Sequence, residues 1–267
     1  MSIQMVAIDM DGTLLHDDHS MSKRNIETIR KVADKGVEIV LCTGRSPVST
    51  LPYLEELGLE GVVITHNGAA TIGSEGRKVL HQFEMNNADL DPYLRYCREH
   101  QLHFDVNTAF DLYVDTMEVL TSEVLALYSQ FLIQPKLLPS WDALQEPVLK
   151  MTITAEKEIL DKVEDDLKGW DNKLQFIRSG DFFIDIMNKE ATKGHALMNL
   201  AKQQQVTREN ILALGNYYND MTMIQYAGIG IAMGNSPLDV QAAADDVTFS
   251  NNEDGVSAAL EKYILSV

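Results

Sequence analysis

The sequence is poor in cysteine and in basic residues, and both shortages narrow the classes of protein to consider. Its 267 residues include only Cys42 and Cys97, so we expect neither a zinc site nor a disulfide. Asp and Glu number 40 against 22 Lys and Arg, which gives a net charge of −18. Because nucleic acids and anionic membranes are bound through clustered cations, we expect no nucleic-acid partner and no membrane partner.

Long apolar segments, internal repeats and low-complexity tracts are also missing. No apolar run approaches the length of a membrane-spanning helix, and an apolar strand pattern begins at once, without a charged leader. The sequence therefore predicts a cytoplasmic globular protein. Its length favours one large domain or two unequal ones.

Short buried strands alternate with helices at both ends of the sequence. The apolar runs and helix-capping residues predict, in order, a strand at 5–8, a helix at 22–36, strands at 37–42 and 61–65, a helix at 194–205, and strands at 211–214, 230–233 and 247–250. This alternation is typical of parallel sheets. We therefore predict an α/β fold with a Rossmann-like parallel-sheet core and helices on both faces.

The middle of the sequence has a different pattern, in which hairpins alternate with helices. It predicts helices at 87–100, 121–132 and 156–168 and strands at 103–107, 111–115, 149–154, 174–179 and 182–187. This pattern indicates a mixed α+β cap domain inserted into the parallel domain. The expected boundaries are 1–83 and 188–267 for the core and 84–187 for the insertion.

Polar residues follow the ends of several predicted strands. Asp9, Thr43, Asn67 and Asn216 each lie just past the carboxyl end of a predicted strand. Ligands of open α/β sheets bind at the edge formed by the carboxyl ends of the strands. The four residues together therefore indicate a binding site at that edge.

Asp9 and Asp11 form the sharpest pair. Two carboxylates around one bend suit a hard cation, and they also suit a nucleophile beside a general acid/base. Gly12 allows the backbone to approach an anion, and Thr13 can hold the turn. The alternative is an ordinary Asx-type turn with a glycine, and spacing alone leaves both interpretations open.

The segment Asp9-Met10-Asp11-Gly12-Thr13-Leu14-Leu15 resembles the first motif of the haloacid dehalogenase superfamily. Three later segments follow that superfamily in order, and they are Thr43-Gly44-Arg45, Lys193-Gly194 and Gly215-Asn216-Tyr217-Tyr218-Asn219-Asp220. The segments Asn67-Gly68-Ala69 and Ala232-Met233-Gly234-Asn235, with the insertion, resemble its Cof-like phosphatase branch. The resemblance covers essentially the whole chain.

This resemblance implies a Mg²⁺-dependent phosphatase that forms an aspartyl-phosphate intermediate. Asp9 is then the nucleophile, Asp11 the acid/base, and Lys193 the cation that neutralises the transferring group. The implied phosphate-binding residues are Met10, Thr43, Gly44, Lys193 and Asn219. The implied metal site consists of Asp9, Asp11, Asn216 and Asp220, of which Asp220 either orients a metal-bound water or pairs with Lys193.

Without the resemblance, several of these residues have simpler interpretations. Thr43 could cap the segment that follows it, and Arg45 could be a surface cation. Lys193 could be an ordinary first-turn lysine, although a cation is unfavourable at the N-terminus of a helix and its position there calls for a nearby anion. We assign no chemical role to His66 or Asn67.

Asn216 departs from the resemblance, because that superfamily usually has an Asp metal ligand at this position. An Asn oxygen can coordinate Mg²⁺ but brings no charge, so we expect weaker metal binding. Three functions remain open: a phosphatase acting on small phosphorylated metabolites such as sugar phosphates, a phosphate-binding regulatory protein, and a phosphoryl-transferring mutase. The cap is expected to select the substrate, and the chain to be a monomer or weak homodimer.

Overall fold

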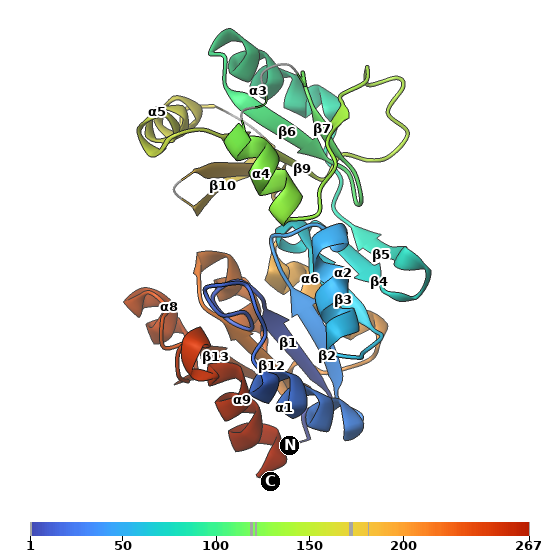
Figure 1. Ribbon diagram of the computed structural model, residues 1–267, viewed down its shortest axis with the longest axis vertical. Helices are drawn as coiled ribbons and strands as arrows, with labels where there is room; N and C mark the ends of the chain where they lie inside the picture. Colours follow the sequence, from blue (N-terminus) through green and yellow to red (C-terminus); the bar gives the residue numbers. More distant parts are fainter. Residues whose placement is uncertain (1, 118–119, 121, 171–172, 181, 267) are drawn as a thin grey trace. The chain divides into compact units, whose positions relative to one another are not determined.

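The computed structural model describes residues 2–117, 120, 122–170, 173–180 and 182–266 (Figure 1). The chain divides into two compact units. The first, which we call the core unit, consists of Met1–His81 and Thr192–Val267, and the second, the inserted unit, consists of Gln82–Ala191. The boundaries expected from the sequence lie close to these. Each unit is described separately below.

The core unit contains an eight-stranded sheet with the order β14-β13-β12-β1-β2-β3-β4-β5. Six neighbouring strands, from β14 to β3, run parallel, as the alternating pattern predicts. Every residue of β1 and β12 is buried. The strands are β1 Met5–Asp9, β2 Glu38–Cys42, β3 Val62–Thr65, β4 Ala70–Gly73, β5 Lys78–Gln82, β12 Ile211–Gly215, β13 Ile229–Ala232 and β14 Asp246–Val247.

Helices cover the core sheet on both faces. The helices are α1 Lys23–Asp34, α2 Pro47–Glu56, α6 Lys193–Gln203, α7 Met221–Tyr226, α8 Leu238–Ala243 and α9 Gly255–Leu260. Apolar residues of α6 and α7 pack with Met5 and Ala7 of β1. Helices α1 and α9 lie together in front of the sheet in Figure 1, where α6 lies behind it. The Ser22 hydroxyl caps α1 as expected, by accepting the Asn25 N–H.

Two details of the core sheet differ from the prediction. Strand β4 pairs antiparallel with β3, and β5 extends this edge, so the sheet is not parallel throughout. The turn at His66–Gly68 reverses the chain, because His66 and Asn67 have left-handed backbone conformations. The strand predicted at 247–250 is the two-residue β14, which ends at Val247.

The inserted unit contains a six-stranded sheet with the order β10-β11-β9-β6-β7-β8. Its strands are β6 His103–Asn107, β7 Leu112–Val114, β8 Lys136–Leu137, β9 Lys150–Thr154, β10 Leu174–Gly180 and β11 Phe183–Asn188, and its helices are α3 Asn87–Glu99, α4 Ser122–Gln130 and α5 Lys157–Leu167. The two predicted hairpins are present. The prediction missed β8, and Thr121, where it began the second helix, lies outside the described residues.

The two faces of this sheet differ in polarity. Val106, Met151 and Ile186 lie side by side on one face, where apolar residues of α3 and α5 cover them. On the opposite face, Asp105 and Thr152 and Asp185 form what we call the polar row. Alternation of side chains along each strand separates the two sets.

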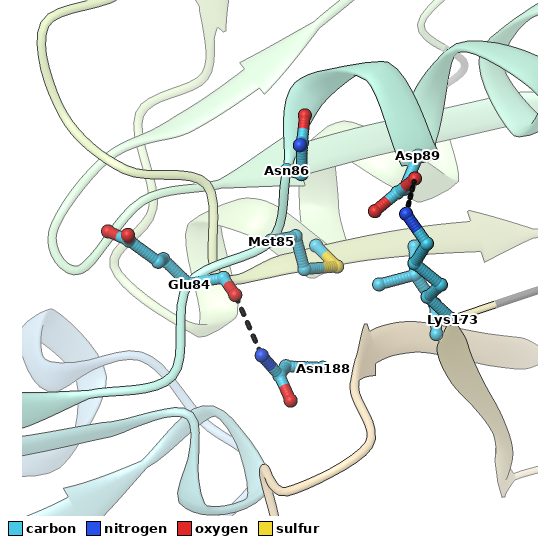
Figure 2. A pocket seen from close by; sticks show the side chains of 7 residues that line it. Glu84, Met85, Asn86, Asp89, Lys173 and Asn188 are labelled. Carbon is cyan, nitrogen blue, oxygen red and sulfur yellow. Dashed lines mark hydrogen bonds and ion pairs between the residues drawn. The ribbon is translucent and has the colours of Figure 1, made fainter.

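A pocket of about 430 Å³ lies within the inserted unit (Figure 2). Its lining includes residues close to the first and to the last residue of that unit. Lys173 forms an ion pair with Asp89 there at 3.5 Å, and the Asn188 amide donates to the Glu84 carbonyl at 2.9 Å. None of the site residues predicted from the sequence lines this pocket. Among the described residues, no helix combines the length and the apolar character needed to cross a bilayer.

Candidate functional site

The carboxyl ends of four strands place the predicted polar residues at one edge of the core sheet. Asp9 is the last residue of β1, and Thr43, His66 and Asn216 directly follow β2, β3 and β12. Since β12, β1, β2 and β3 are parallel neighbours, these ends meet at the same edge. The chain therefore gathers at one place residues that are more than 200 positions apart.

A buried lysine joins two carboxylates at the centre of this edge. The ammonium group of Lys193 lies 2.6 Å from Asp9 Oδ1 and 2.6 Å from Asp220 Oδ1. Lys193 and Asp220 are fully buried, and Asp9 is 4% exposed. Lys193 is the first residue of α6, so the anions that its position called for are these two carboxylates.

The electrostatic balance of this group leaves an excess of negative charge. Burial raises the pKa of Asp9 to about 7, and the Asp220 charge adds to this effect while Lys193 opposes it. Burial by itself would lower the pKa of Lys193, but the two carboxylates beside it raise that pKa above its ordinary value. One ammonium group therefore neutralises two carboxylates only in part. A further cation near Asp9 would stabilise the ionised form of Asp9.

Three oxygen atoms converge beside Asp9 on the side away from Lys193. The inward atom of the Asn216 amide lies 3.1 Å from Asp9 Oδ2 and 3.1 Å from the Asp11 carbonyl oxygen. It also lies 3.3 Å from the Thr13 hydroxyl. With the amide oxygen turned inward, Asn216 accepts from the Thr13 hydroxyl and faces two other acceptors, Asp9 Oδ2 and the Asp11 carbonyl.

This donor set fits Mg²⁺. Mg²⁺ binds oxygens at about 2.0–2.1 Å in an octahedron, so neighbouring ligand oxygens lie about 3 Å apart. Asn216 Oδ1 has that spacing from Asp9 Oδ2 and from the Asp11 carbonyl oxygen. The described residues contain no cluster of three His, Cys, Asp or Glu side chains suited to a metal, because this set includes one amide and one backbone carbonyl.

Asp220 lies outside that group of three oxygens. One of its carboxylate oxygens accepts from Lys193, and the other accepts the backbone N–H groups of Asn216 and Tyr217 at 2.9 and 3.0 Å. These bonds fix the loop that carries Asn216. Of the two roles that the sequence left open for Asp220, the structure places it as the partner of Lys193.

Two of the predicted phosphate-binding residues, Thr43 and Asn219, contact the turn that follows β3. Thr43 is 1% exposed, and its carbonyl accepts the Asn67 N–H at 3.0 Å. The Asn219 amide donates to Asn67 Oδ1 at 3.1 Å. Asn67 thus connects two of the predicted residues, a positioning role that sequence reasoning missed. The dipeptide Asn67-Gly68, which favours the left-handed backbone that Asn67 adopts, was the available signal.

Gly68 sets the distance between this turn and Lys193. It has φ +99°, and a Cβ added there would lie 2.2 Å from the Thr192 carbonyl oxygen. No larger residue fits between the turn and the start of α6. The close approach brings the first residue of α6 to the edge of the sheet.

The interpretation of Arg45 as a surface cation was wrong. Its side chain is 7% exposed, and its Nε donates to Asp11 Oδ2 at 2.8 Å while its Nη2 donates to Asp11 Oδ1. Arg45 also donates to the Tyr53 hydroxyl at 3.2 Å. Both carboxylate oxygens of Asp11 therefore accept from a guanidinium group, whereas its backbone carbonyl oxygen is one of the three oxygens beside the Asn216 amide. The Thr43 hydroxyl does cap the segment that follows it, by accepting the Arg45 N–H at 3.1 Å, whereas the N-cap of α2 is Ser46.

The polar row of the inserted unit is a second group of buried polar side chains. Asp105 accepts from Asn107 and from the Tyr128 hydroxyl, and Asp185 accepts from Thr152 at 2.9 Å. Lys150 lies 3.4 Å from Asp185. Burial raises the pKa of Asp105 to about 6. This group of side chains thus contains one cation, Lys150, and two carboxyl groups, those of Asp105 and Asp185.

Asp105 should make the stability of the protein depend on pH. Its pKa of about 6 in the folded protein exceeds the ordinary Asp value of 3.8, so its favourable contribution to stability is complete below pH 4 and disappears as the pH rises through 6. This shift corresponds to a loss on the order of 3 kcal/mol. Urea unfolding of Asp105→Asn between pH 4 and 7 should lack this decline. Asp142→Asn, at an exposed carboxylate of the same unit, is the control, and equal pH profiles for Asp105→Asn and wild type would contradict the prediction.

Comparison with known proteins identifies relatives over nearly the whole chain. A family model described as haloacid dehalogenase-like hydrolase matches residues 6–260. A Bacillus subtilis protein named "Putative phosphatase YxeH" is 32% identical over 98% of this chain and 99% of its own length. The matched region includes both units and every predicted site residue.

Solved structures give the same result. A haloacid dehalogenase-like hydrolase from Bacteroides thetaiotaomicron superposes with a TM-score of 0.87 and 28% identity, covering 98% of this chain and 99% of the other. A sugar phosphatase of HAD subclass IIB, BT4131, superposes with a TM-score of 0.82 and 25% identity, covering 97% and 98%. The predicted α/β fold is thereby confirmed, as is the resemblance on which the site was assigned.

Proposed function

This chain belongs to the haloacid dehalogenase-like hydrolases, and from that premise we propose that it hydrolyses phosphate monoesters of small metabolites through a phosphorylated Asp9, with Mg²⁺ as cofactor. The observation that carries the proposal is the position of Asp9. Its carboxylate ends a buried strand, one of its oxygens contacts a buried lysine, and the other lies 3.1 Å from the inward atom of the Asn216 amide. A carboxylate held between two cation positions can remain ionised in a buried site and approach a phosphate.

In the first step, a carboxylate oxygen of Asp9 attacks the phosphorus atom, and the bond from phosphorus to the alcohol oxygen breaks. Asp11 gives a proton to that oxygen, so the alcohol leaves neutral. In the second step, Asp11 takes a proton from water, the water oxygen attacks phosphorus, and inorganic phosphate leaves Asp9. The Asp11 carboxylate must leave Arg45 for both transfers, because Arg45 holds both of its oxygens.

Lys193, Thr43, Gly44, Met10 and Asn219 bind the phosphate in this proposal. Lys193 neutralises charge on the transferring group, the Thr43 hydroxyl and the Gly44 and Met10 N–H groups bind its oxygens, and Asn219 completes the set. Asp9, the Asp11 carbonyl and Asn216 would hold Mg²⁺, which supplies charge stabilisation to the phosphoryl group. Preorganised charge of this kind accounts for most phosphoryl-transfer catalysis.

One observation favours a second candidate function. Asn216 brings no charge to the three-oxygen group, and weaker metal binding would suit a phosphate-ligand binding protein with regulatory function. The hydrolase is preferred, because a binding protein needs neither the nucleophile Asp9 nor the acid/base Asp11. A mutase that passes the phosphoryl group to a second alcohol is a further alternative to transfer to water.

We also propose that the inserted unit selects the substrate, and that the substrates are sugar phosphates or related metabolites. The proposed phosphate-binding groups are all in the core unit, and they would contact only the phosphate group, which all substrates of this class share. The polar row of the inserted unit, by contrast, offers carboxylate and hydroxyl acceptors and donors of the kind that bind sugar hydroxyls. The sugar phosphatase BT4131, which has the same fold, supports this class.

The test is phosphate release from a panel of sugar phosphates, other small phosphomonoesters and a generic aryl phosphate, with Mg²⁺ titrated into the high millimolar range. We expect hydrolysis that requires Mg²⁺, and a preference among the sugar phosphates that changes in Asp105→Asn while the aryl phosphate is still hydrolysed. Absence of turnover at every Mg²⁺ concentration would exclude the hydrolase. Transfer of phosphate to an added alcohol without release would favour the mutase.

A further inference from the structure

The side-chain amide of Asn216 can take two orientations that differ only by exchange of its oxygen and nitrogen. The inward position lies 3.1 Å from Asp9 Oδ2 and from the Asp11 carbonyl. Both of these neighbours are acceptors. Oxygen in that position therefore faces two acceptors, whereas an NH₂ group there donates to both.

The surroundings of the amide accept both orientations. The Thr13 hydroxyl, 3.3 Å from the inward position, can donate to an oxygen or accept from a nitrogen by rotating its proton. The outward atom lies against Gly12, where an added Cβ would come within 2.3 Å of it. A glycine at this position leaves room for either atom. Thr13 is fully buried, so water does not compete for its hydroxyl.

The hydrogen bonds decide which orientation is stable in each state. Without a cation, the NH₂-inward orientation makes two donor contacts to the acceptors of the metal site, one of them to the carboxylate of Asp9, and such charge-assisted bonds are strong. With a cation between the three oxygens, the same NH₂ group would point at a positive charge. The amide must then rotate by half a turn to present its oxygen.

We propose that Asn216 is a two-position amide that occupies the cation site with its NH₂ group when the metal is absent and ligates the metal with its oxygen when it is present. The metal therefore competes with a group of the protein itself. This proposal rests on the proposed Mg²⁺-dependent function. It goes beyond that function, because it gives the metal-free protein an organised nucleophile and a physical reason to expect weaker metal binding with Asn216 than with Asp.

An Asp at position 216 could not behave in this way. It would place a carboxylate oxygen 3.1 Å from Asp9 Oδ2, and two such charges repel each other unless a cation lies between them. The Asn216→Asp variant should consequently bind Mg²⁺ about 10–100-fold more tightly than wild type. It should also unfold at a lower temperature than wild type without metal and gain more thermal stability from Mg²⁺.

The decisive measurement is the ¹⁵N–¹H spectrum of the Asn216 NH₂ group, which needs no turnover. The resonance pair is assigned as the one missing from Asn216→Asp, recorded with Mg²⁺ so that this variant stays folded. In metal-free wild type we expect hydrogen-bonded, slowly exchanging NH₂ protons. Mg²⁺ should shift both resonances and speed their exchange, with the midpoint at the Mg²⁺ Kd measured by calorimetry. Gln203→Glu, an exposed amide-to-acid change on α6, is the control and should match wild type.

Two outcomes would overturn the proposal. One is an Asn216 NH₂ pair that stays unchanged while calorimetry records saturation with Mg²⁺. The other is equal Mg²⁺ affinity in wild type and Asn216→Asp. Either result leaves the phosphatase assignment intact, since that is tested by phosphate release. Conversely, amide resonances that respond to Mg²⁺ in a protein that releases no phosphate would support the two-position amide and reject the proposed function.

Discussion

Phosphate release by the Asp9→Asn variant is expected to fall by a factor on the order of 10⁴ or more relative to wild type. An amide oxygen is a poor nucleophile toward phosphorus, so the covalent route is closed. The fold should survive the change, because Lys193 keeps Asp220 as its buried partner. The measurement is kcat for the best substrate of the panel, at saturating Mg²⁺, with folding checked by circular dichroism.

The matched control is Asp34→Asn, which removes an exposed carboxylate at the end of α1. It should retain wild-type kcat. Acid-quenched wild-type enzyme should carry a phosphoryl group that Asp9→Asn lacks. Undiminished turnover in Asp9→Asn, or a phosphoryl group trapped on another residue, would reject Asp9 as the nucleophile.

Replacing Lys193 with methionine should cost about 3–5 kcal/mol of the free energy of unfolding, in addition to abolishing turnover. Methionine fills most of the volume of the lysine but leaves Asp9 and Asp220 buried without their shared cation. Their mutual repulsion is then unopposed at a place where Asp220 is fully buried and Asp9 is 4% exposed. Urea unfolding monitored on the core unit would measure the loss.

Two further variants separate the lost ion pair from other effects of Lys193→Met. Lys202→Met, at an exposed position of the same helix, should leave stability and turnover near wild-type values. The double variant Lys193→Met/Asp220→Asn should recover part of the lost stability, because it removes one of the unpaired charges. A Lys193→Met protein as stable as wild type would show that the buried carboxylates do not depend on this lysine.

The sequence by itself determined the class of fold, because strands and helices follow from patterns a few residues long. Apolar runs that end at Asp9, Cys42 and Thr65 mark strands buried on both sides, as parallel strands are. The change of pattern in the middle of the chain marked the inserted unit. The prediction missed β4, which pairs antiparallel with β3, and β5 beside it, because the dipeptide Asn67-Gly68 signals a turn but does not tell whether the chain returns to the same sheet.

The sequence also determined which residues to examine at the site. Asp9, Asp11 and Lys193 stood out, the first two by their spacing around one bend and the lysine by its unfavourable place at a helix N-terminus. The partners of these residues could not be predicted. Arg45 had the appearance of a surface cation, yet it holds the carboxylate of Asp11.

Only the tertiary structure decided what Asn216 does beside Asp9. The sequence identified a neutral residue where the resemblance calls for a carboxylate, and it predicted a weaker metal site. It could not indicate that the amide lies 3.1 Å from two acceptors and can satisfy both with its own NH₂ group. The reason is physical: local patterns set the backbone of each strand and turn, whereas a contact between residues 9 and 216 exists only once the sheet has brought the ends of β1 and β12 together.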